Sequence, residues 1–555
     1  MKKNRIQFSR LSAQGPTLAW LFFLCSLCPL GLGAQTQEPP PAEPAGPALS
    51  PADTERPAAS APVADSTIYR IRRIDFNITG RSRPFALLYN GKLTDLKDIS
   101  GRENLEIFIQ DRTQRLINQR VLENDVHIEY TLGEMDESGK VPVDLLITVR
   151  DTWNLMIFPK PLWDNNSGFD LTIKARDYNF FGTMNPLRID LGYLYETKND
   201  RNDSKFNLLV DTDIPFRAMG LMWNINFDNE FNYTWGDPLN YKNSAGVAVQ
   251  VPFKTTTFTF DVEHYINVNE RNGDWDSNPP NGYGKDYRGK YFDGILNSVE
   301  FSAAWKIPTG IKPIGNGELT YTPRIAEEIV YTPENGHEWL DLRKGPFTKL
   351  EQKFGFERVD WIGNFRKGMD VSFNNDNSFN HNRNVWNNSY SLNATGHFIL
   401  SDFFGITART QFRHWFYHFP NDLYHEAGDV LRGILNNKLQ GDLMLSLNLE
   451  FPVKIWTARP SDWFHNSKFR FFNFELYLSP MMDIGMLRNP KTPNSQDLIK
   501  MYYTAGLEMF IFPEFMRSLY LRFSYGVNLE DWVRYHDIPL KNNEFFIGLG
   551  HFFGE

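Results

Sequence analysis

Most of the chain, from residue 152 to Glu555, alternates between apolar and polar residues with the period of two that is typical of β-strands. Clear examples are the segments at 187–196, 221–228 and 443–450, in which apolar side chains share one face and polar side chains share the other. Alternation of this kind occurs in soluble β-sandwiches as well as in membrane barrels. It therefore predicts a mostly β protein without deciding between the two.

Three further features favour a transmembrane antiparallel β-barrel in this region. The alternating segments are about ten residues or longer, which is enough for a tilted strand to cross a bilayer. Aromatic residues gather where segments end, as at 180–181 and 471–472, and such girdles mark membrane interfaces. Short turns alternate with long polar connections, such as 269–295 and 326–346. Counting the segments gives about 16 to 18 strands, and an even number is expected for an outer-membrane barrel.

Residues 68–151 predict a small α/β module ahead of the barrel. The segment Tyr69–Phe76 alternates as a strand, and the stretch 105–116 carries apolar residues at helical spacings of three, four and seven. Two further alternating runs, 126–130 and 143–149, flank a turn and predict a hairpin. The expected order is β–α–β–β, and no residues in the module have catalytic spacing.

The N-terminal residues form two segments of different character. Basic residues, then an apolar run from Leu18 to Leu32 and small residues, are typical of a signal peptide, so we expect residues 1–34 to be removed on export. Cys25 and Cys28 lie in this segment, which leaves the mature chain without thiols. A lipoprotein anchor is the less favoured alternative, because bulky leucines precede both cysteines. Residues 35–67 are rich in proline and alanine and predict a disordered linker.

Composition excludes several classes of protein. A mean hydropathy of -0.44 excludes a polytopic helical membrane protein, which needs repeated apolar runs of about 20 residues. The chain has 45 Phe, 23 Tyr and 14 Trp, too many aromatic residues for a disordered protein. A net charge of -9 argues against a nucleic-acid partner. Because hydrolase, phosphate-loop and metalloprotease motifs are missing from the sequence, we expect no enzyme, no metal and no cofactor.

Two local features stand out within the predicted barrel. The segment Gly428–Ile434 contains an Arg432-Gly433 pair in a long connection, where an arginine is ordinarily solvated. The segment Met481–Gly485 places Asp483 in the middle of an otherwise apolar strand. A carboxylate on the lipid face would be costly, so Asp483 should face the lumen, where it contacts either water or a cation. Arg432, on a loop folded into the barrel, is the candidate cation.

With these features, the chain resembles the outer-membrane assembly and translocation superfamily that includes BamA, TamA and the two-partner secretion transporters. Members have N-terminal POTRA modules of β–α–α–β–β order, a barrel of 16 strands, a Val-Arg-Gly-Phe/Tyr motif in the sixth extracellular loop and a later Phe-x-Asp-x-Gly strand. The segments 431–434 and 481–485 stand in the places of the two motifs, and 177–183 resembles the family's Asp-x-x-Leu-Gly-Thr turn. Residues 431, 434 and 481 depart from the family's residue types, and one POTRA module is expected where BamA-like members usually have several.

The resemblance implies that the loop tip lies in the lumen, pairs with the aspartate strand and is held there in the working state. The C-terminal strand would form half of a seam with the first strand, which offers an edge to a client if the seam is weak. In a barrel protein with a signal peptide, the same strand is also expected to be the sorting end that assembly machinery reads, with core packing of its phenylalanines as the alternative. The residues that would carry these roles are Leu431, Arg432, Gly433 and Ile434 in the loop, Asp483 and Gly485 in the partner strand, and Phe545, Phe546, Phe552 and Phe553 in the C-terminal strand.

The expected domains are a signal peptide (1–34), a disordered linker (35–67), a periplasmic POTRA-like module (68–151) and an outer-membrane barrel (152–555). The expected function is the insertion or translocation of client proteins. The expected partners are unfolded outer-membrane or secreted clients, outer-membrane lipids, and periplasmic chaperones or accessory lipoproteins. The alternative is a passive outer-membrane channel or porin-like structural barrel, which explains the alternation equally well but not the Arg-Gly loop and the Asp strand together.

Overall fold

The computed structural model describes residues 67–551, except for 95, 97, 165–167, 199–200, 235–238, 269–294, 315–316, 332–344, 383, 417–424, 427–429, 435–439, 489–498, 518, 531–532 and 534–542. The predicted signal peptide, nearly all of the predicted linker, and Phe552 and Phe553 therefore lie outside the described residues. Among the described helices, none is long and apolar enough to cross a membrane.

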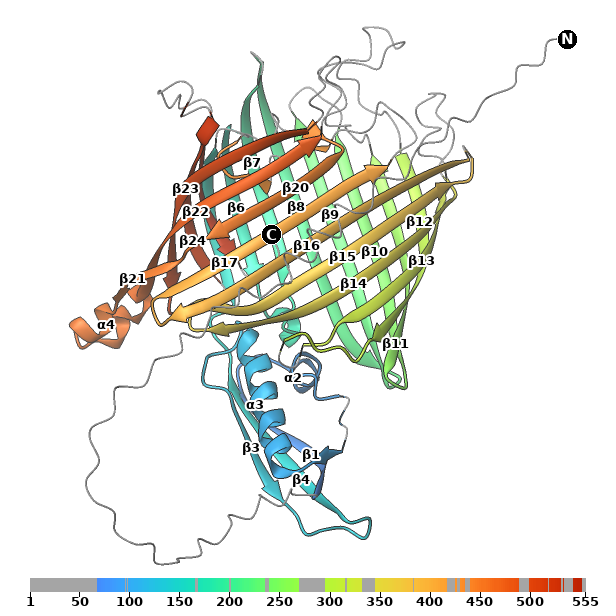
Figure 1. Cartoon of the computed structure of the whole chain (residues 1–555), viewed down its shortest axis with the longest axis vertical. Coiled ribbons are helices and arrows are strands. Elements are labelled where there is room, and N and C mark those ends of the chain that lie inside the picture. Colours follow the sequence, from blue (N-terminus) through green and yellow to red (C-terminus); the bar gives the residue numbers. More distant parts are fainter. Residues whose placement is uncertain are drawn as a thin grey trace, which may run out of the picture. The chain divides into compact units, whose positions relative to one another are not determined.

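The first folded elements form a small α/β module (Figure 1). They are β1 (Ile68–Thr79), α2 (Pro84–Asn90), β2 (Ile99–Ser100), α3 (Arg102–Asn118), β3 (His127–Leu132) and β4 (Lys140–Arg150). The sheet order is β2-β1-β4-β3, in which β1 and β4 are parallel and β3 and β4 form the predicted hairpin. The predicted apolar face of α3 is buried, since Leu105, Ile109 and Leu116 belong to the core of the module. The pattern did not predict α2, which has 7 residues and is too short for a helical period to repeat.

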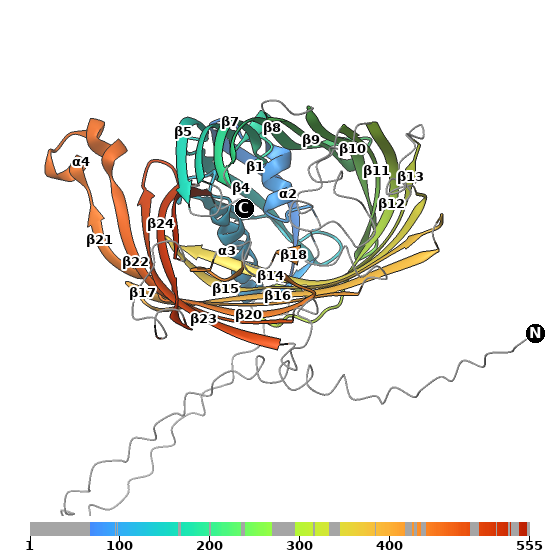
Figure 2. The same cartoon turned by 90° about the horizontal axis from the view of Figure 1, so that it is seen from above.

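Apart from the short strands β18 (His425–Glu426) and β19 (Gln440–Gly441), which form a separate antiparallel pair, the remaining strands form one closed sheet (Figures 1 and 2). They are β5 (Leu155–Asp164), β6 (Gly168–Asp177), β7 (Leu187–Lys198), β8 (Arg201–Ala218), β9 (Leu221–Thr234), β10 (Asn240–Phe253), β11 (Thr256–Val268), β12 (Ile295–Pro308), β13 (Thr320–Val330), β14 (Phe347–Ile362), β15 (Phe365–Asn380), β16 (Val385–Ser401), β17 (Phe404–Phe416), β20 (Leu443–Glu450), β21 (Val453–Ala458), β22 (Phe474–Arg488), β23 (Ile499–Pro513), β24 (Leu519–Asn528) and β25 (Glu544–His551). Each neighbouring pair with a described register is antiparallel, and β25 closes the barrel beside β5.

The strand number corrects the expectation of 16. The sheet contains 19 strands, of which β20 and β21 lie end to end and both pair with β17 and β22. They are separated at Phe451 and Pro452, because a proline has no N–H to give to the ladder. Counting them as one interrupted strand leaves 18 positions around the barrel. The number 16 came from the resemblance, whereas the alternating segments themselves allowed up to 18.

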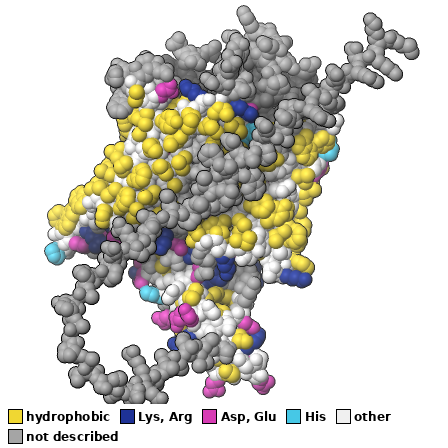
Figure 3. Space-filling model, viewed as in Figure 1, with side chains coloured by type: hydrophobic (Ala, Val, Ile, Leu, Met, Phe, Trp, Pro, Cys, Tyr) yellow, Lys and Arg dark blue, Asp and Glu magenta, His cyan; other side chains and the backbone are white. Residues whose placement is uncertain are grey.

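The two faces of the barrel differ as the alternation predicts. Outward side chains such as Ile173 (47% exposed), Phe260 (47%) and Ile325 (54%) leave large apolar surfaces uncovered, and Figure 3 shows a broad apolar area over the strands. Inward side chains pair their charges, as Glu300 does with Arg324 and with Lys349 (2.6 Å). An apolar exterior around a polar lumen is the arrangement of a barrel that crosses lipid.

One end of the barrel carries two-residue turns, at 219–220, 254–255, 363–364 and 402–403. The turn at 363–364 meets the module, because buried Arg120, just after α3, donates hydrogen bonds to the carbonyl oxygens of Gly363 (3.3 Å) and Arg517. Long connections, such as 269–294 between β11 and β12, join strands at the opposite end.

The turn 177–183, singled out by the resemblance, also holds the module. Buried Asn179 donates hydrogen bonds to Ser82 (2.8 Å) and Asp151 (3.0 Å), and Arg83 N–H donates to the Gly182 carbonyl (3.0 Å). Gly182 has φ +74°, and a Cβ there would lie 2.1 Å from the carbonyl oxygen of Arg81. Glycine is therefore required at this position, because the left-handed backbone is strained for other residues and a Cβ atom would collide with the carbonyl oxygen.

Candidate functional site

Asp483 lies on the lumenal side of β22, as its chemistry requires. Alternate residues of β22 are buried, among them Ser479, Met481, Asp483 and Gly485, while Met482 between them is 38% exposed on the outer face. Asp483 itself is 1% exposed, paired in register with Asn448 on β20 and Thr504 on β23. A carboxylate at this depth is stable only with cationic or hydrogen-bonding partners.

The loop tip at 430–434 provides the cation. The Arg432 guanidinium donates to both carboxylate oxygens of Asp483, with Nε–Oδ2 at 3.1 Å and Nη2–Oδ1 at 2.5 Å. The backbone N–H of Arg432 donates to Oδ2 as well, at 2.9 Å. Asn448 fixes the preceding residue by donating to the carbonyl oxygen of Val430 at 2.8 Å. The structure thus brings together the two residues that the sequence marked separately, in a bidentate charge-assisted contact.

Arg432 also contacts two carboxylates that the sequence analysis did not single out. Its Nη1 lies 2.8 Å from Glu450 Oε1 on β20 and 3.3 Å from Glu508 Oε2 on β23. Arg522 of β24 lies 2.5 Å from the other oxygen of Glu508. The signal was available, because Glu508, like Asp483, is an acidic residue within a strongly apolar strand. Two guanidinium groups therefore meet three carboxylates, and Arg432 is the cation that all three share.

Two glycines make room for the loop tip against the barrel wall. A Cβ at Gly485 would lie 2.3 Å from Leu431 Cδ1, so the fully buried leucine rests directly on the strand backbone. Gly433 has φ +92°, and a Cβ there would lie 2.6 Å from the backbone nitrogen of Val527 on β24. Ile434 and Leu431 pack with Val430, Met444 and Leu487 in a small buried cluster. The predicted loop and strand motifs therefore fit each other in shape as well as in charge.

The terminal strand is tied to the same loop. The backbone N–H of Gly433 donates to a carboxylate oxygen of Glu544, the first residue of β25, at 2.7 Å. Phe545 and Phe546 pair with Tyr525 and Ser524 of β24, and the Arg522 guanidinium lies 5.4 Å from the centre of the Phe546 ring. Glu544 was not predicted, because a single acidic residue at a strand start is common on protein surfaces. The loop tip consequently contacts β20, β22, β23, β24 and β25.

The ion pairs and hydrogen bonds of this site can hold strands in place. In the described part of the chain, no group of three or more His, Cys, Asp or Glu residues could hold a metal ion. The polar groups of the site are engaged with one another, and none forms a nucleophile–base pair. What the arrangement can do is hold five neighbouring strands in one relative position through a single loop.

Comparison with known proteins adds only distant structural likeness. CdiB from Acinetobacter baumannii matches with a TM-score of 0.44 and 14% identity over 87% of this chain and 74% of that one. BamA from Haemophilus ducreyi lacking POTRA domains 1–3 matches with a TM-score of 0.38 and 12% identity over 87% and 85%. CdiB from Escherichia coli matches with a TM-score of 0.39 and 8% identity over 90% and 93%. No family model and no curated protein sequence matches the chain. Similarity at this level assigns neither a family nor an activity.

Proposed function

We propose that the protein is an outer-membrane barrel that inserts or translocates client polypeptides, with its α/β module, a POTRA-like domain, on the periplasmic side. The observation that carries this proposal is the seating of Arg432 between Asp483, Glu450 and Glu508 inside the barrel. A passive pore has no need for a loop tip that is ion-paired to the lumenal wall and hydrogen-bonded to the terminal strand. A barrel whose wall must rearrange for a client does need such a support.

The proposed mechanism breaks no covalent bond, and we propose no catalytic residue, metal or cofactor. A client segment entering lipid must have its backbone N–H and C=O groups paired. Two places could pair them. In the module, β3 is hydrogen-bonded on one side only among the described strands, which leaves an edge for strand addition. In the barrel, the seam between β5 and β25 would be the second place, with Glu544 linking it to the loop.

The apolar outer surface of the barrel supports the proposed location in the outer membrane. Apolar side chains cover the outward face of the strands, and a surface of this extent is stable only against lipid or another protein. The proposed partners are therefore the lipids of the outer membrane and unfolded outer-membrane or secreted proteins, with periplasmic chaperones or accessory lipoproteins delivering them.

The proposal is tested by depleting the protein from its host and measuring the abundance of outer-membrane and secreted proteins. We expect a subset to fall on depletion, and Arg432→Ala to restore them less well than the wild-type chain. A matched control is Arg324→Ala, which removes a lumenal arginine from an ion pair with Glu300 on the β12–β13 wall. Unchanged abundances on depletion, together with a large ion conductance that Arg432→Ala does not alter, would favour the passive channel instead.

A further inference from the structure

A chamber of about 2760 Å³ lies between the α/β module and the lumenal wall, and Glu450 is the residue of its lining that also belongs to the Arg432 site. Residues of α2, α3 and the strands from β8 to β17 form most of its walls, and a few residues of β20 and β22–β24 complete them. Much of the neutral wall is hydroxyl or amide, as at Thr257, Thr322 and Asn393. Pockets for small molecules occupy about 300–1,000 Å³, so the chamber has room for a longer, extended ligand.

The charge of the chamber is opposite to that of the chain. Its described lining includes eleven lysines and arginines but six aspartates and glutamates, an excess of five positive charges. The whole chain has a net charge of -9. Positive charge is therefore concentrated at this mouth of the lumen, and low-dielectric walls focus such a field on an entering anion.

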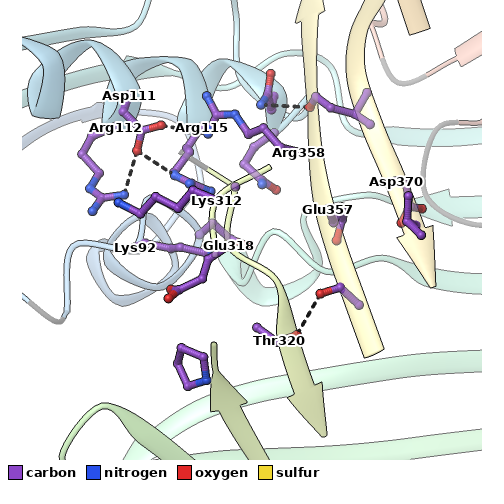
Figure 4. Close-up of a pocket in the computed structure, with 18 of the residues that line it drawn as sticks. Lys92, Asp111, Arg112, Arg115, Lys312, Glu318, Thr320, Glu357, Arg358 and Asp370 are labelled. Carbon is purple, nitrogen blue, oxygen red and sulfur yellow. Dashed lines mark hydrogen bonds and ion pairs between the residues drawn. The ribbon is translucent and has the colours of Figure 1, made fainter. Parts of the chain in front are cut away.

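Acidic residues in the chamber do not neutralise this excess. Asp111 of α3 lies within 2.9 Å of both Arg112 and Arg115 and within 2.8 Å of Arg358, so one carboxylate serves three guanidinium groups. Lys92 and Lys312 occupy the same part of the pocket (Figure 4), and neither has an ion-pair partner within the part of the chain that the structure describes. Glu318 and Glu357 also lie in this part of the pocket, so the positive excess comes from the lining as a whole, while Lys92 and Lys312 are two cations that no ion pair among the described residues engages.

Lys92 experiences this repulsion directly. Partial burial and the neighbouring cations Arg115, Lys306 and Arg112 lower the pKa of Lys92, and Glu357 offsets only part of this effect; the side chain still reaches the solvent of the chamber. Its backbone is also unusual, with φ +50° directly after the cap of α2 at Gly91. Glycine or asparagine is the usual residue for this left-handed conformation after a helix. A lysine here is less favourable for the fold than glycine or asparagine would be.

We propose that the chamber binds acidic segments of extended polypeptide, with Lys92 and Lys312 as the principal cations and the hydroxyl and amide wall pairing the peptide backbone. This proposal rests on the proposed function, since it names the chemistry of the client segment that enters from the module side. The excess positive charge selects carboxylates over neutral or basic segments. The uncharged polar wall suits a peptide backbone better than acyl chains.

The test is fluorescence anisotropy of a fluorescein-labelled oligoglutamate with the purified full chain in detergent micelles. We expect saturable binding that weakens with salt, and a loss of about fivefold in affinity for each of Lys92→Gly and Lys312→Asn, the effect of one solvated ion pair. Lys92→Gly relieves the backbone conformation, so its denaturation midpoint should not fall, which separates lost binding from lost folding. The control is Lys468→Asn, an exposed lysine outside the chamber, which should bind as the wild type does.

Three outcomes would overturn the proposal: wild-type affinity in both chamber variants, equal binding of an oligolysine, or binding of inorganic polyphosphate without binding of oligoglutamate. None of these outcomes depends on whether depletion alters outer-membrane protein levels. Failure of the chamber proposal is therefore distinguishable from failure of the proposed function.

Discussion

Replacing Arg432 with alanine should be the most damaging single change at the loop tip. The substitution removes the guanidinium that contacts Asp483, Glu450 and Glu508, whose side chains are 1%, 19% and 0% exposed. Arg522 remains paired with Glu508, but it has no ion pair with Asp483 among the described contacts. Asp483 is then left as a buried carboxylate without a cation within reach.

The expected loss of stability is large because the substitution leaves Asp483 buried and charged without its cation. Removing one partner of a buried ion pair costs about 3–5 kcal/mol of the free energy of unfolding, which is the range expected for Arg432→Ala. Asp483→Ala should cost less, about 1.5–3 kcal/mol, because Arg432 keeps Glu450 and Glu508. Arg432→Lys keeps the charge but loses the bidentate contact, and should fall between the wild type and the alanine variant.

The assay is unfolding in denaturant of the folded barrel in detergent, followed by the shift in gel mobility between folded and unfolded forms. The double variant Arg432→Ala/Asp483→Ala should be more stable than the sum of the single effects predicts, with a coupling of about 1–3 kcal/mol. Combining Arg432→Ala with Asp483→Asn should also recover stability, because the uncompensated charge is gone. Additive effects, or a larger loss for Asp483→Ala than for Arg432→Ala, would refute the reasoning.

The remaining predictions concern packing, the terminal strand, the module and pH. Gly485→Ala should cost about 1–3 kcal/mol in the same unfolding assay, because its methyl group would collide with Leu431, and Leu431→Ala should recover part of the loss. Glu544→Gln weakens the acceptor for the loop backbone, and should increase amide hydrogen exchange in β25 without changing exchange in the module. Arg120→Ala should speed hydrogen exchange in α3, because the hydrogen bonds that Arg120 donates to Gly363 and Arg517 are lost, and unchanged exchange would show that these contacts are dispensable. Hydrogen bonds from Arg70 and Lys140 lower the pKa of Asp98 to about 2. The ionised Asp98 therefore stabilises the module at pH values above its unfolded pKa of about 3.9, and this stabilisation is lost as pH falls through about 2. Asp98→Asn should lower the thermal stability of the module at neutral pH and have little effect in strong acid.

The barrel could be predicted from the sequence because its exterior and lumen impose opposite polarity on alternate residues. The same rule placed Asp483 in the lumen, since a charged group on the lipid face is too costly. The number of strands could not be predicted as well from the sequence. Pro452 splits one strand into β20 and β21, and no residue pattern distinguishes an interrupted strand from two separate strands.

Contacts that depend on distant parts of the chain could not be predicted. Glu450 and Glu508 approach Arg432 only because the loop tip at 430–434 lies against the lumenal side of three adjacent strands. Arg120 resembles any helix-end arginine in the sequence, yet it is buried against turns that lie 243 and 397 positions away. Such contacts are set by the closure of the barrel, which local periodicity does not encode.

The most direct test of the central claim is a reconstituted folding assay. Purified protein is placed in proteoliposomes, a urea-unfolded outer-membrane barrel protein is added, and the folded fraction is followed over time by heat-modifiable mobility on a gel. We predict that the wild-type chain accelerates folding over empty liposomes, and that Arg432→Ala loses most of this acceleration while Arg324→Ala retains it. Client folding at the same rate with and without the protein, for outer-membrane and secreted clients alike, would contradict the account.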